Sequence, residues 1–187
     1  MYAAGTFGVF FVLLALIVFW AISVYNRLVR QRALKDEGWS GIDVQLKRRH
    51  DVVGNLVNAV KGFMQHEKSI LEEVTRQRSM SREASGAAAV GLAETGLSQA
   101  VGRLFAVMEN YPTLKANENV LQLQAALADL EDEIQKARRY YNATVRDLNV
   151  SIQSFPSNII AQRFGFQKAD FFELTTVQER DVPTVAL

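Results

Sequence analysis

The chain has 187 residues, and its 21 basic and 20 acidic side chains leave a net charge of only +1. This balance gives no support for nucleic acid as a partner, because nucleic-acid-binding domains carry a clear excess of Lys and Arg. The complete lack of Cys excludes disulfide scaffolds, Cys-ligated zinc, iron–sulfur clusters, thiol catalysis and lipoprotein anchors.

The first element in the chain is an uncharged run, because every charged residue lies at or after Arg27. Phe7 to Val24 is apolar almost throughout, and as a helix it spans roughly 27 Å, close to the hydrocarbon thickness of a bilayer of roughly 30 Å. The start of the chain is not basic, and no Ala-x-Ala pattern follows the run, which argues against a cleaved signal peptide. The sequence therefore predicts a retained signal anchor over residues 1–26, with the lipid bilayer as its partner.

The flanks of this run predict its orientation. Trp20 and Tyr25 suit the headgroup level, where amphipathic rings collect. No Lys or Arg precedes the run, whereas four basic residues follow it within a short distance: Arg27, Arg30, Arg32 and Lys35. By the positive-inside rule we expect one membrane span, with the N-terminus outside and the remaining chain in the cytoplasm.

The next element is a joint at Gly38-Trp39-Ser40-Gly41, where we expect a membrane-proximal helix to end and a new helix to begin. Ser40 with Asp43 three residues on resembles a cap for that restart. The basic run Lys47-Arg48-Arg49 follows. As an upright helix it would lie roughly 30 Å beyond the span, outside the reach of screened lipid charge. Three interpretations stay open for it: lipid contact, a partner surface and a solvated helix face.

Apolar spacing of three and four residues then predicts an all-α fold. One helix covers Val53 to Val74, a small-residue linker covers residues 85–91, and a second helix runs from Leu92 to Met108. A turn signal, Asn110-Tyr111-Pro112, separates it from a third helix. Three long helices with short connections predict an antiparallel, up-and-down bundle.

The third helix is expected from about Asn117 to Ser151, because a seven-residue repeat is clear there. Leu121 and Val145 lie outside the apolar seam and need a second surface, which predicts a homo-oligomer. The tail residues Val182, Val185 and Leu187 are expected to pack on a neighbouring subunit. The first row of the repeat is apolar throughout, and the second becomes polar toward its end: Val120, Leu127, Ile134, Tyr141, Leu148; and Leu123, Leu130, Ala137, Thr144, Ser151.

No catalytic, cofactor-binding or metal-binding pattern is found. His66-Glu67 is not followed by the second His of a zinc protease, and no Glu-x-x-His pair is present. We expect His50 and His66 to be capping or surface groups. The acidic residues near position 131 are expected to form a solvated face with neighbouring basic residues. The sequence thus predicts a protein that is not an enzyme.

Several blocks in order resemble the LemA family, and the resemblance extends from Tyr25 to Glu173. It implies a bacterial, membrane-anchored, antiparallel bundle in the cytoplasmic (inner) membrane and says little about biochemistry. The family pattern differs at Gly54, where a proline is usual, and at Gly38, where an alanine is usual. The blocks are 25–29, 37–49, 55–62, 66–67, 109–116, 155–161, 164–166 and 171–173.

The resemblance divides the chain into an anchor (1–26), a LemA-like bundle (27–173) and a polar tail (174–187). The matching residues are most simply packing residues. Phe155-Pro156 ends a helix, and Ser157 or Asn158 is expected to cap a short final one. The alternative is one exposed interaction surface formed by Trp39, Lys47, Arg48, Arg49, Phe155, Phe164 and Phe166.

The functional hypothesis is a non-enzymatic, membrane-tethered scaffold or adaptor that associates with itself or with other membrane proteins. Two alternatives stay open. One is a regulatory partner of a membrane protease, and the other is an assembly that shapes the membrane.

Overall fold

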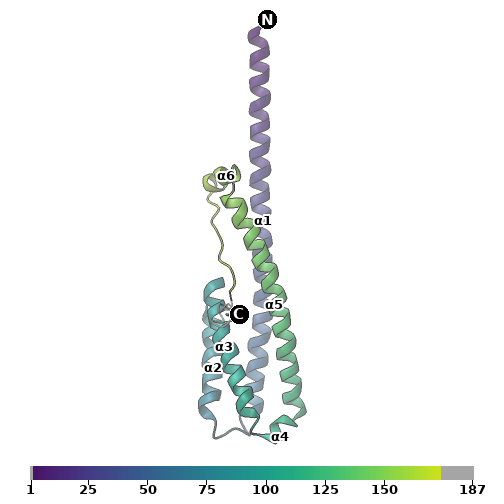
Figure 1. The fold of residues 1–187 in the computed structure, drawn as a ribbon, viewed down its shortest axis with the longest axis vertical. Coiled ribbons are helices and arrows are strands. Elements are labelled where there is room, and N and C mark those ends of the chain that lie inside the picture. The colour runs from purple at the N-terminus through teal and green to yellow at the C-terminus, as the bar shows by residue number, and fades with distance from the viewer. Residues whose placement is uncertain (1, 174–187) are drawn as a thin grey trace, which may run out of the picture. The chain divides into compact units, whose positions relative to one another are not determined.

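The computed structural model describes the backbone of residues 2–173 and the side chains of residues 10–173. Within this range the protein is all-helical, which confirms the expected fold class (Figure 1). The helices are α1 (Tyr2–Val60), α2 (Lys68–Glu83), α3 (Ala87–Met108), α4 (Pro112–Lys115), α5 (Glu118–Gln153) and α6 (Ser157–Arg163).

The chain forms two compact units. We call residues 1–39 together with 140–169 the anchor unit, and residues 40–139 together with the segment that begins at Asp170 the bundle unit. Both α1 and α5 contribute to both units. The predicted boundaries at residues 26 and 173 therefore stay a prediction, because the packing divides the chain in a different way.

The expected joint at Gly38–Gly41 is wrong, because α1 continues through it as one helix and Ser40 lies inside that helix rather than at a cap. Gly38 is instead a close-packing residue. A Cβ atom there would lie only 3.2 Å from the Cα of Tyr141 on α5. Next to it, the rings of Trp39 and Tyr141 lie 5.4 Å apart between centroids. The glycine thus lets two helices of the anchor unit approach closely and does not bend the chain.

The helix predicted over Val53 to Val74 is also wrong in one respect, because it is two helices. The turn between α1 and α2 covers residues 61–67, and the carbonyl oxygen of Val60 accepts from the amides of Phe63 and Met64 there. Met64 is fully buried in spite of the turn. The apolar spacing therefore continues across the break, and periodicity alone does not show where the chain reverses. The linker before α3 is shorter than expected, and its Gly86 has a φ of 87°.

The bundle unit has one apolar core to which α1, α2, α3, α4 and α5 all contribute. Burial of these side chains is the main contribution to the stability of such a unit. The core residues are Val53, Leu56, Val60, Met64, Leu71, Val74, Leu97, Ala100, Val101, Leu104, Met108, Leu114, Val120 and Leu127.

The long predicted helix is confirmed as α5, which begins and ends within two residues of the expected bounds. Asn117 caps it, because its side-chain oxygen accepts from the amide of Val120 at 3.2 Å. The whole first row of the repeat is buried. Of the two residues expected outside the seam, Leu121 is 48% exposed, but Val145 is fully buried, so the expectation for Val145 is wrong.

The anchor unit has its own small core of Leu28, Leu148, Ile152 and Ala161. Asn149 on α5 holds the backbone of Ala169 within this unit by two hydrogen bonds. Its side-chain amide donates to the carbonyl of Ala169, and its oxygen accepts from the amide of Ala169, both at 2.9 Å. Neither Ser157 nor Asn158 caps α6 as expected, because α6 begins at Ser157 after Pro156 without a side-chain cap, and the Ser157 hydroxyl donates backward to the carbonyl oxygens of Ser151 and Ser154.

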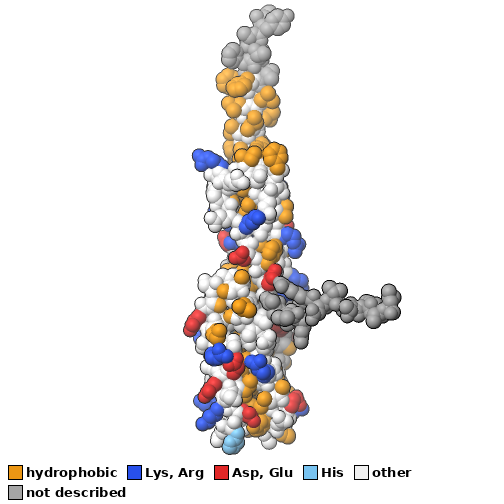
Figure 2. Space-filling model, turned by 60° about the vertical axis from the view of Figure 1, so that its left-hand side comes forward, with side chains coloured by type: hydrophobic (Ala, Val, Ile, Leu, Met, Phe, Trp, Pro, Cys, Tyr) orange, Lys and Arg blue, Asp and Glu red, His pale blue; other side chains and the backbone are white. Residues whose placement is uncertain are grey.

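By length and composition, α1 is able to cross a membrane, since an apolar window in it has a mean hydropathy of 2.0 and only 6% of that window is buried. In Figure 2 the described part of this run shows orange side chains and no blue or red ones. The run Phe7–Val24, expected to span a membrane, belongs to this helix. Val182, Val185 and Leu187 lie outside the described residues.

Candidate functional site

The most unusual feature of the bundle unit is a buried carboxylate. Glu94, on α3, is 0% exposed, although an ionised side chain is almost never fully buried without partners. Helix α3 places it there because its turns are built from small residues, so the helix packs closely against its neighbours. The partners of Glu94 come from two further helices.

Arg49 of α1 supplies the positive charge. Its Nη1 lies 3.1 Å from Oε2 of Glu94 and 3.2 Å from Oε2 of Glu131 on α5. Its Nη2 donates to the hydroxyl of Ser98 at 2.7 Å. One guanidinium group thus joins three helices, and its planar fork suits this task better than a Lys ammonium would.

His50, the next residue of α1, contacts the other oxygen of the same carboxylate. Its Nε2 lies 2.7 Å from Oε1 of Glu94 and 3.0 Å from the hydroxyl of Ser81 on α2. Ser81 also donates to Oε1 of Glu94. We assign the Nε2–H tautomer to His50, since a carboxylate oxygen only accepts.

The pKa of Glu94 follows from these contacts. Burial raises the pKa of this carboxyl, but the hydrogen bond from His50, the charge of Arg49 and the hydrogen bond from Ser81 outweigh burial. The pKa therefore lies below the ordinary value of 4.5, and the group is ionised at neutral pH. We call Arg49, His50, Ser81, Glu94 and Ser98, with Glu131, the polar cluster.

The polar cluster takes its members from α1, α2, α3 and α5, so its hydrogen bonds and ion pairs link all four helices. A buried ion pair is weak evidence for net stability, because desolvation opposes the attraction of the charges. Losing a single partner is nevertheless costly, because the other charge then stays buried without compensation. The cluster is thus well suited to allow one arrangement of the helices rather than several.

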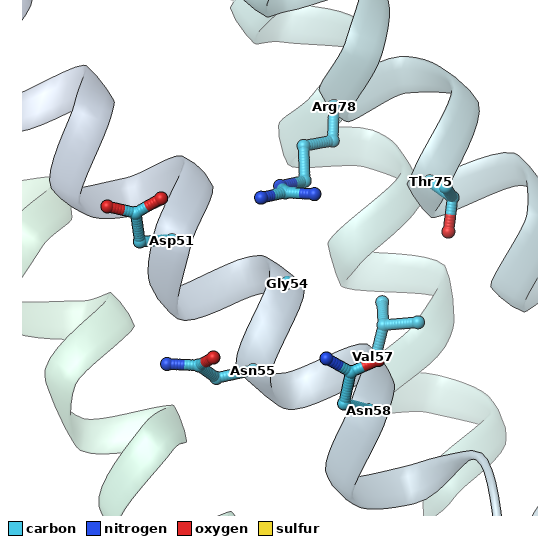
Figure 3. Close-up of a pocket in the computed structure, with 7 residues that line it drawn as sticks. All are labelled: Asp51, Gly54, Asn55, Val57, Asn58, Thr75 and Arg78. Atoms are coloured by element: carbon cyan, nitrogen blue, oxygen red, sulfur yellow. The ribbon is translucent and has the colours of Figure 1, made fainter.

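A polar groove of about 320 Å³ lies next to the cluster, between α1 and α2. Its lining residues, drawn in Figure 3, are Asp51, Gly54, Asn55, Val57, Asn58, Thr75 and Arg78. The side chains of Asp51, Asn55 and Asn58 are exposed and follow one another along α1. This size is at the lower end for small-molecule sites, which are also mostly apolar. The groove suits a few polar side chains of a partner better than a buried cofactor.

Arg78 links the groove to the polar cluster. Its Nε donates to the carbonyl oxygen of His50 at 2.6 Å, and in Figure 3 its guanidinium group lies over α1 near Gly54. A Cβ atom at Gly54 would lie 3.0 Å from that group, so the glycine makes room for it. Among the described residues no acidic side chain forms an ion pair with Arg78. The chemistry therefore fits a carboxylate supplied from outside the groove.

The structure corrects two expectations about this region. Arg49 was expected on an exposed surface but is 6% exposed, because it pairs with Glu94 and Glu131. His50 was expected at a cap or on the surface but is equally buried. Lys47 and Arg48 are exposed, and Lys47 forms a surface pair with Asp43 at 2.6 Å. His66 is exposed, as expected.

Sequence reasoning missed Glu94, Ser81 and the groove. One signal was available, because Glu94 is the only acidic residue of α3 and stands on its apolar, small-residue side. Glu131 was expected on a solvated face and is partly exposed; Gln135 of its own helix donates to its Oε1 at 3.1 Å, but its ion-pair partner, Arg49, comes from another helix. Sequence spacing shows partners along one helix, whereas these partners lie across helices.

The remaining candidates of the interaction surface belong to the anchor unit. Trp39 is half-buried against Tyr141. Phe155 is 81% exposed and Phe164 is 58% exposed, while Phe166 is half-buried. The interaction surface itself stays a prediction. Within residues 10–173, no group of three His, Asp or Glu side chains is placed to hold a metal ion.

Comparison with known proteins gives a family. The model of the LemA family matches residues 38–187. Protein LemA of Metamycoplasma hominis is 27% identical over 185 residues, which cover 97% of this chain and 84% of that protein.

Magnetosome protein MamQ 1 of Paramagnetospirillum magneticum is 27% identical over 175 residues, which cover 80% of this chain. Magnetosome protein MamQ of Magnetospirillum gryphiswaldense is 26% identical over 174 residues, or 79% of this chain. In both cases the match spans 64% of the length of the magnetosome protein.

Proposed function

The chain belongs to the LemA family, and we propose that it is a non-enzymatic, membrane-tethered scaffold whose bundle unit docks other membrane proteins or further copies of itself. One observation carries the proposal. Helix α1 is a single helix that bears the apolar run near its start and core residues of the bundle unit, such as Val53 and Leu56, near its end.

The polar groups of the bundle unit support a structural role for its interior. Arg49, His50, Ser81 and Glu94 of the polar cluster are buried and pair with one another, so these four side chains have no free access to a substrate. The groove offers Arg78, which has no acidic partner among the described residues, beside the exposed side chains of Asn55 and Asn58. We propose that a polar segment with a carboxylate, from a second protein, binds there.

We further propose that the protein is a single-pass protein of the bacterial cytoplasmic membrane, with the bundle unit in the cytoplasm. The four basic residues that follow the apolar run support this orientation. The homo-oligomer is part of the same proposal. Its support is Leu121, which is apolar and 48% exposed on α5.

Mass photometry of the full chain in mild detergent tests self-association. The proposal expects a species several times the 20.9 kDa of one chain. A strictly monomeric protein would leave only docking to other proteins. Turnover of any small substrate by the purified full chain would contradict the non-enzymatic role.

A second proposal is an assembly that shapes the membrane. The similarity to proteins named for the magnetosome supports it. The full chain, reconstituted densely into vesicles, should then change their curvature, as seen by electron microscopy. Vesicles that stay unchanged would contradict this second proposal and leave the scaffold intact.

A further inference from the structure

The anchor unit leaves three large apolar side chains of the α6 region uncovered. Phe155 is 81% exposed, Ile159 is 54% exposed and Phe164 is 58% exposed. Their neighbours Ile160 and Ala161 pack inward on the core of the same unit. Helix α6 and its flanks are therefore amphipathic, with one face satisfied and one face without a partner inside the described unit.

This open face lies beside the end of the apolar run of α1. Tyr25 directly follows Val24, the last residue of that run. The ring of Tyr25 lies 4.8 Å from the ring of Phe164 and 5.9 Å from that of Phe166, between centroids. Val24 itself packs on the same core as Ile160. Figure 1 shows α6 next to α1 within this unit.

The charges closest in sequence to this face are basic. Residues 10–35 and 148–169 contain no Asp or Glu, but both segments contain basic residues. The acidic residues of the unit lie just outside these segments: Asp36, which pairs with Lys35 at 2.6 Å, Glu37 and Asp147. The guanidinium carbon of Arg32 lies 5.3 Å from the centre of the Phe166 ring, so at least one basic side chain lies directly beside the aromatic residues. The basic residues are Arg27, Arg30, Arg32, Lys35, Arg163 and Lys168.

We propose that the α6 region is a second membrane contact, which inserts Phe155, Ile159 and Phe164 into the headgroup boundary of an anionic bilayer. Aromatic and aliphatic side chains on one face, surrounded by Lys and Arg, are the composition of interfacial membrane elements. A bilayer is the occupant because the face continues directly from the span that crosses it. Aromatic rings at this level, such as Tyr25, match the headgroup region.

The contact would act as a brace. A single span leaves the attached domain free to tilt, whereas a second contact beside the span restricts tilting and rotation of the anchor unit. The inference holds for either orientation of the protein, because α6 lies beside the charged end of the span on whichever side that end is found. It rests on the proposed membrane span, and the experiment below separates the two.

The test uses the full chain, which has no native Cys, so single Cys variants can be labelled cleanly. An environment-sensitive nitrobenzoxadiazole dye is attached to Ile159→Cys. A matched control is Leu92→Cys, an apolar residue of the bundle unit that is 67% exposed. A second control is Ile17→Cys inside the apolar run. Each protein is reconstituted in nanodiscs of phosphatidylcholine and phosphatidylglycerol, with a nitroxide on the lipid near the headgroup or deep in the acyl chain.

The proposal expects the label at 159 to lose most of its fluorescence to the shallow nitroxide, to shift to the blue and to resist iodide. The label at 92 should be insensitive to both nitroxides and open to iodide. Quenching at 159 should weaken in nanodiscs of phosphatidylcholine alone, and equal quenching there would overturn the role of the basic residues.

Three results would overturn the brace. A label at 159 that iodide reaches as freely as the label at 92 would show a solvated face. A label that resists iodide but ignores both nitroxides would show a protein on this face instead of lipid. If the deep nitroxide quenches the label at 17 but neither nitroxide quenches the label at 159, the span holds and only the second contact fails. If the label at 17 also escapes, the span itself is wrong.

Discussion

Replacing Glu94 by Gln tests the polar cluster most sharply, because the change keeps the shape of the side chain and removes its charge. Arg49 would then lose its closest buried counter-charge, at 3.1 Å, and His50 would lose its carboxylate. Removing one partner of a buried ion pair costs about 3–5 kcal/mol. Because Glu131 and Ser98 still contact Arg49, we expect Glu94→Gln to lower the free energy of unfolding by the lower end of this range, about 3 kcal/mol.

The assay is urea unfolding of the full chain in mild detergent, followed by circular dichroism at the helix band, with linear extrapolation. Glu133→Gln is the matched control. This variant also removes a charged pair, but Glu133 and its partner Lys136 both lie on α5 and are more than half exposed at the surface. Exposed ion pairs contribute little to stability, so we expect no measurable change in the free energy of unfolding of Glu133→Gln.

A double variant separates the loss of the pair from a general loss of packing. Arg49→Met together with Glu94→Gln leaves neither of the two charges uncompensated at the centre of the cluster. We therefore expect the double variant to lose less stability than the sum of the two single variants, by at least about 1 kcal/mol. A Glu94→Gln protein within 1 kcal/mol of wild type, or strictly additive losses, would refute the reasoning.

Four further outcomes are expected at particular residues. Folding lowers the pKa of Glu94, so the ionised carboxylate stabilises the folded state above the ordinary value of 4.5, and this stabilisation is lost as pH falls through the folded-state pKa. The difference in unfolding free energy between wild type and Glu94→Gln should therefore shrink in acid. A difference that widens would contradict the lowered pKa of Glu94. Gly91→Ala should destabilise the bundle unit and release the buried Phe172, because its Cβ would lie 2.3 Å from the carbonyl oxygen of Glu173. Gly102 lies on the same helix, and a Cβ atom there would meet nothing within 4 Å, so Gly102→Ala should raise the free energy of unfolding by about 0.5–1 kcal/mol in the same urea assay. A reporter fused after Leu187 should report the cytoplasm, and a tag cleaved by protease on intact spheroplasts would reverse the topology.

The fold was predictable where a pattern is local. The uncharged run before Arg27, the heptad rows of α5 and the turn at Pro112 each depend on neighbours in sequence, and the structure contains all three elements. The turn after Val60 was not predictable in this way, since Met64 keeps its apolar place in the core through the break.

The candidate site was much less predictable, because its contacts join distant parts of the chain. Arg49 and Glu94 are far apart in sequence, and so are Arg78 and the carbonyl of His50. The run Lys47 to Arg49 looks uniformly basic, yet the helix turns Lys47 and Arg48 outward and Arg49 into the core. Gly38 was expected in a joint and Gly54 stands where the family usually has a proline, whereas each makes room for a side chain or helix that only the fold brings near.

Photocrosslinking in native membranes tests the proposed docking function most directly. Benzoylphenylalanine is placed at Asn58, in the groove, in the full chain and is irradiated in cells. The account predicts a discrete adduct heavier than the 20.9 kDa chain, which Arg78→Met abolishes and Lys47→Met leaves unchanged. Both variants should keep the helical signal of wild type. An unmodified 20.9 kDa chain as the sole product, or an adduct that does not depend on Arg78, would contradict docking through this groove.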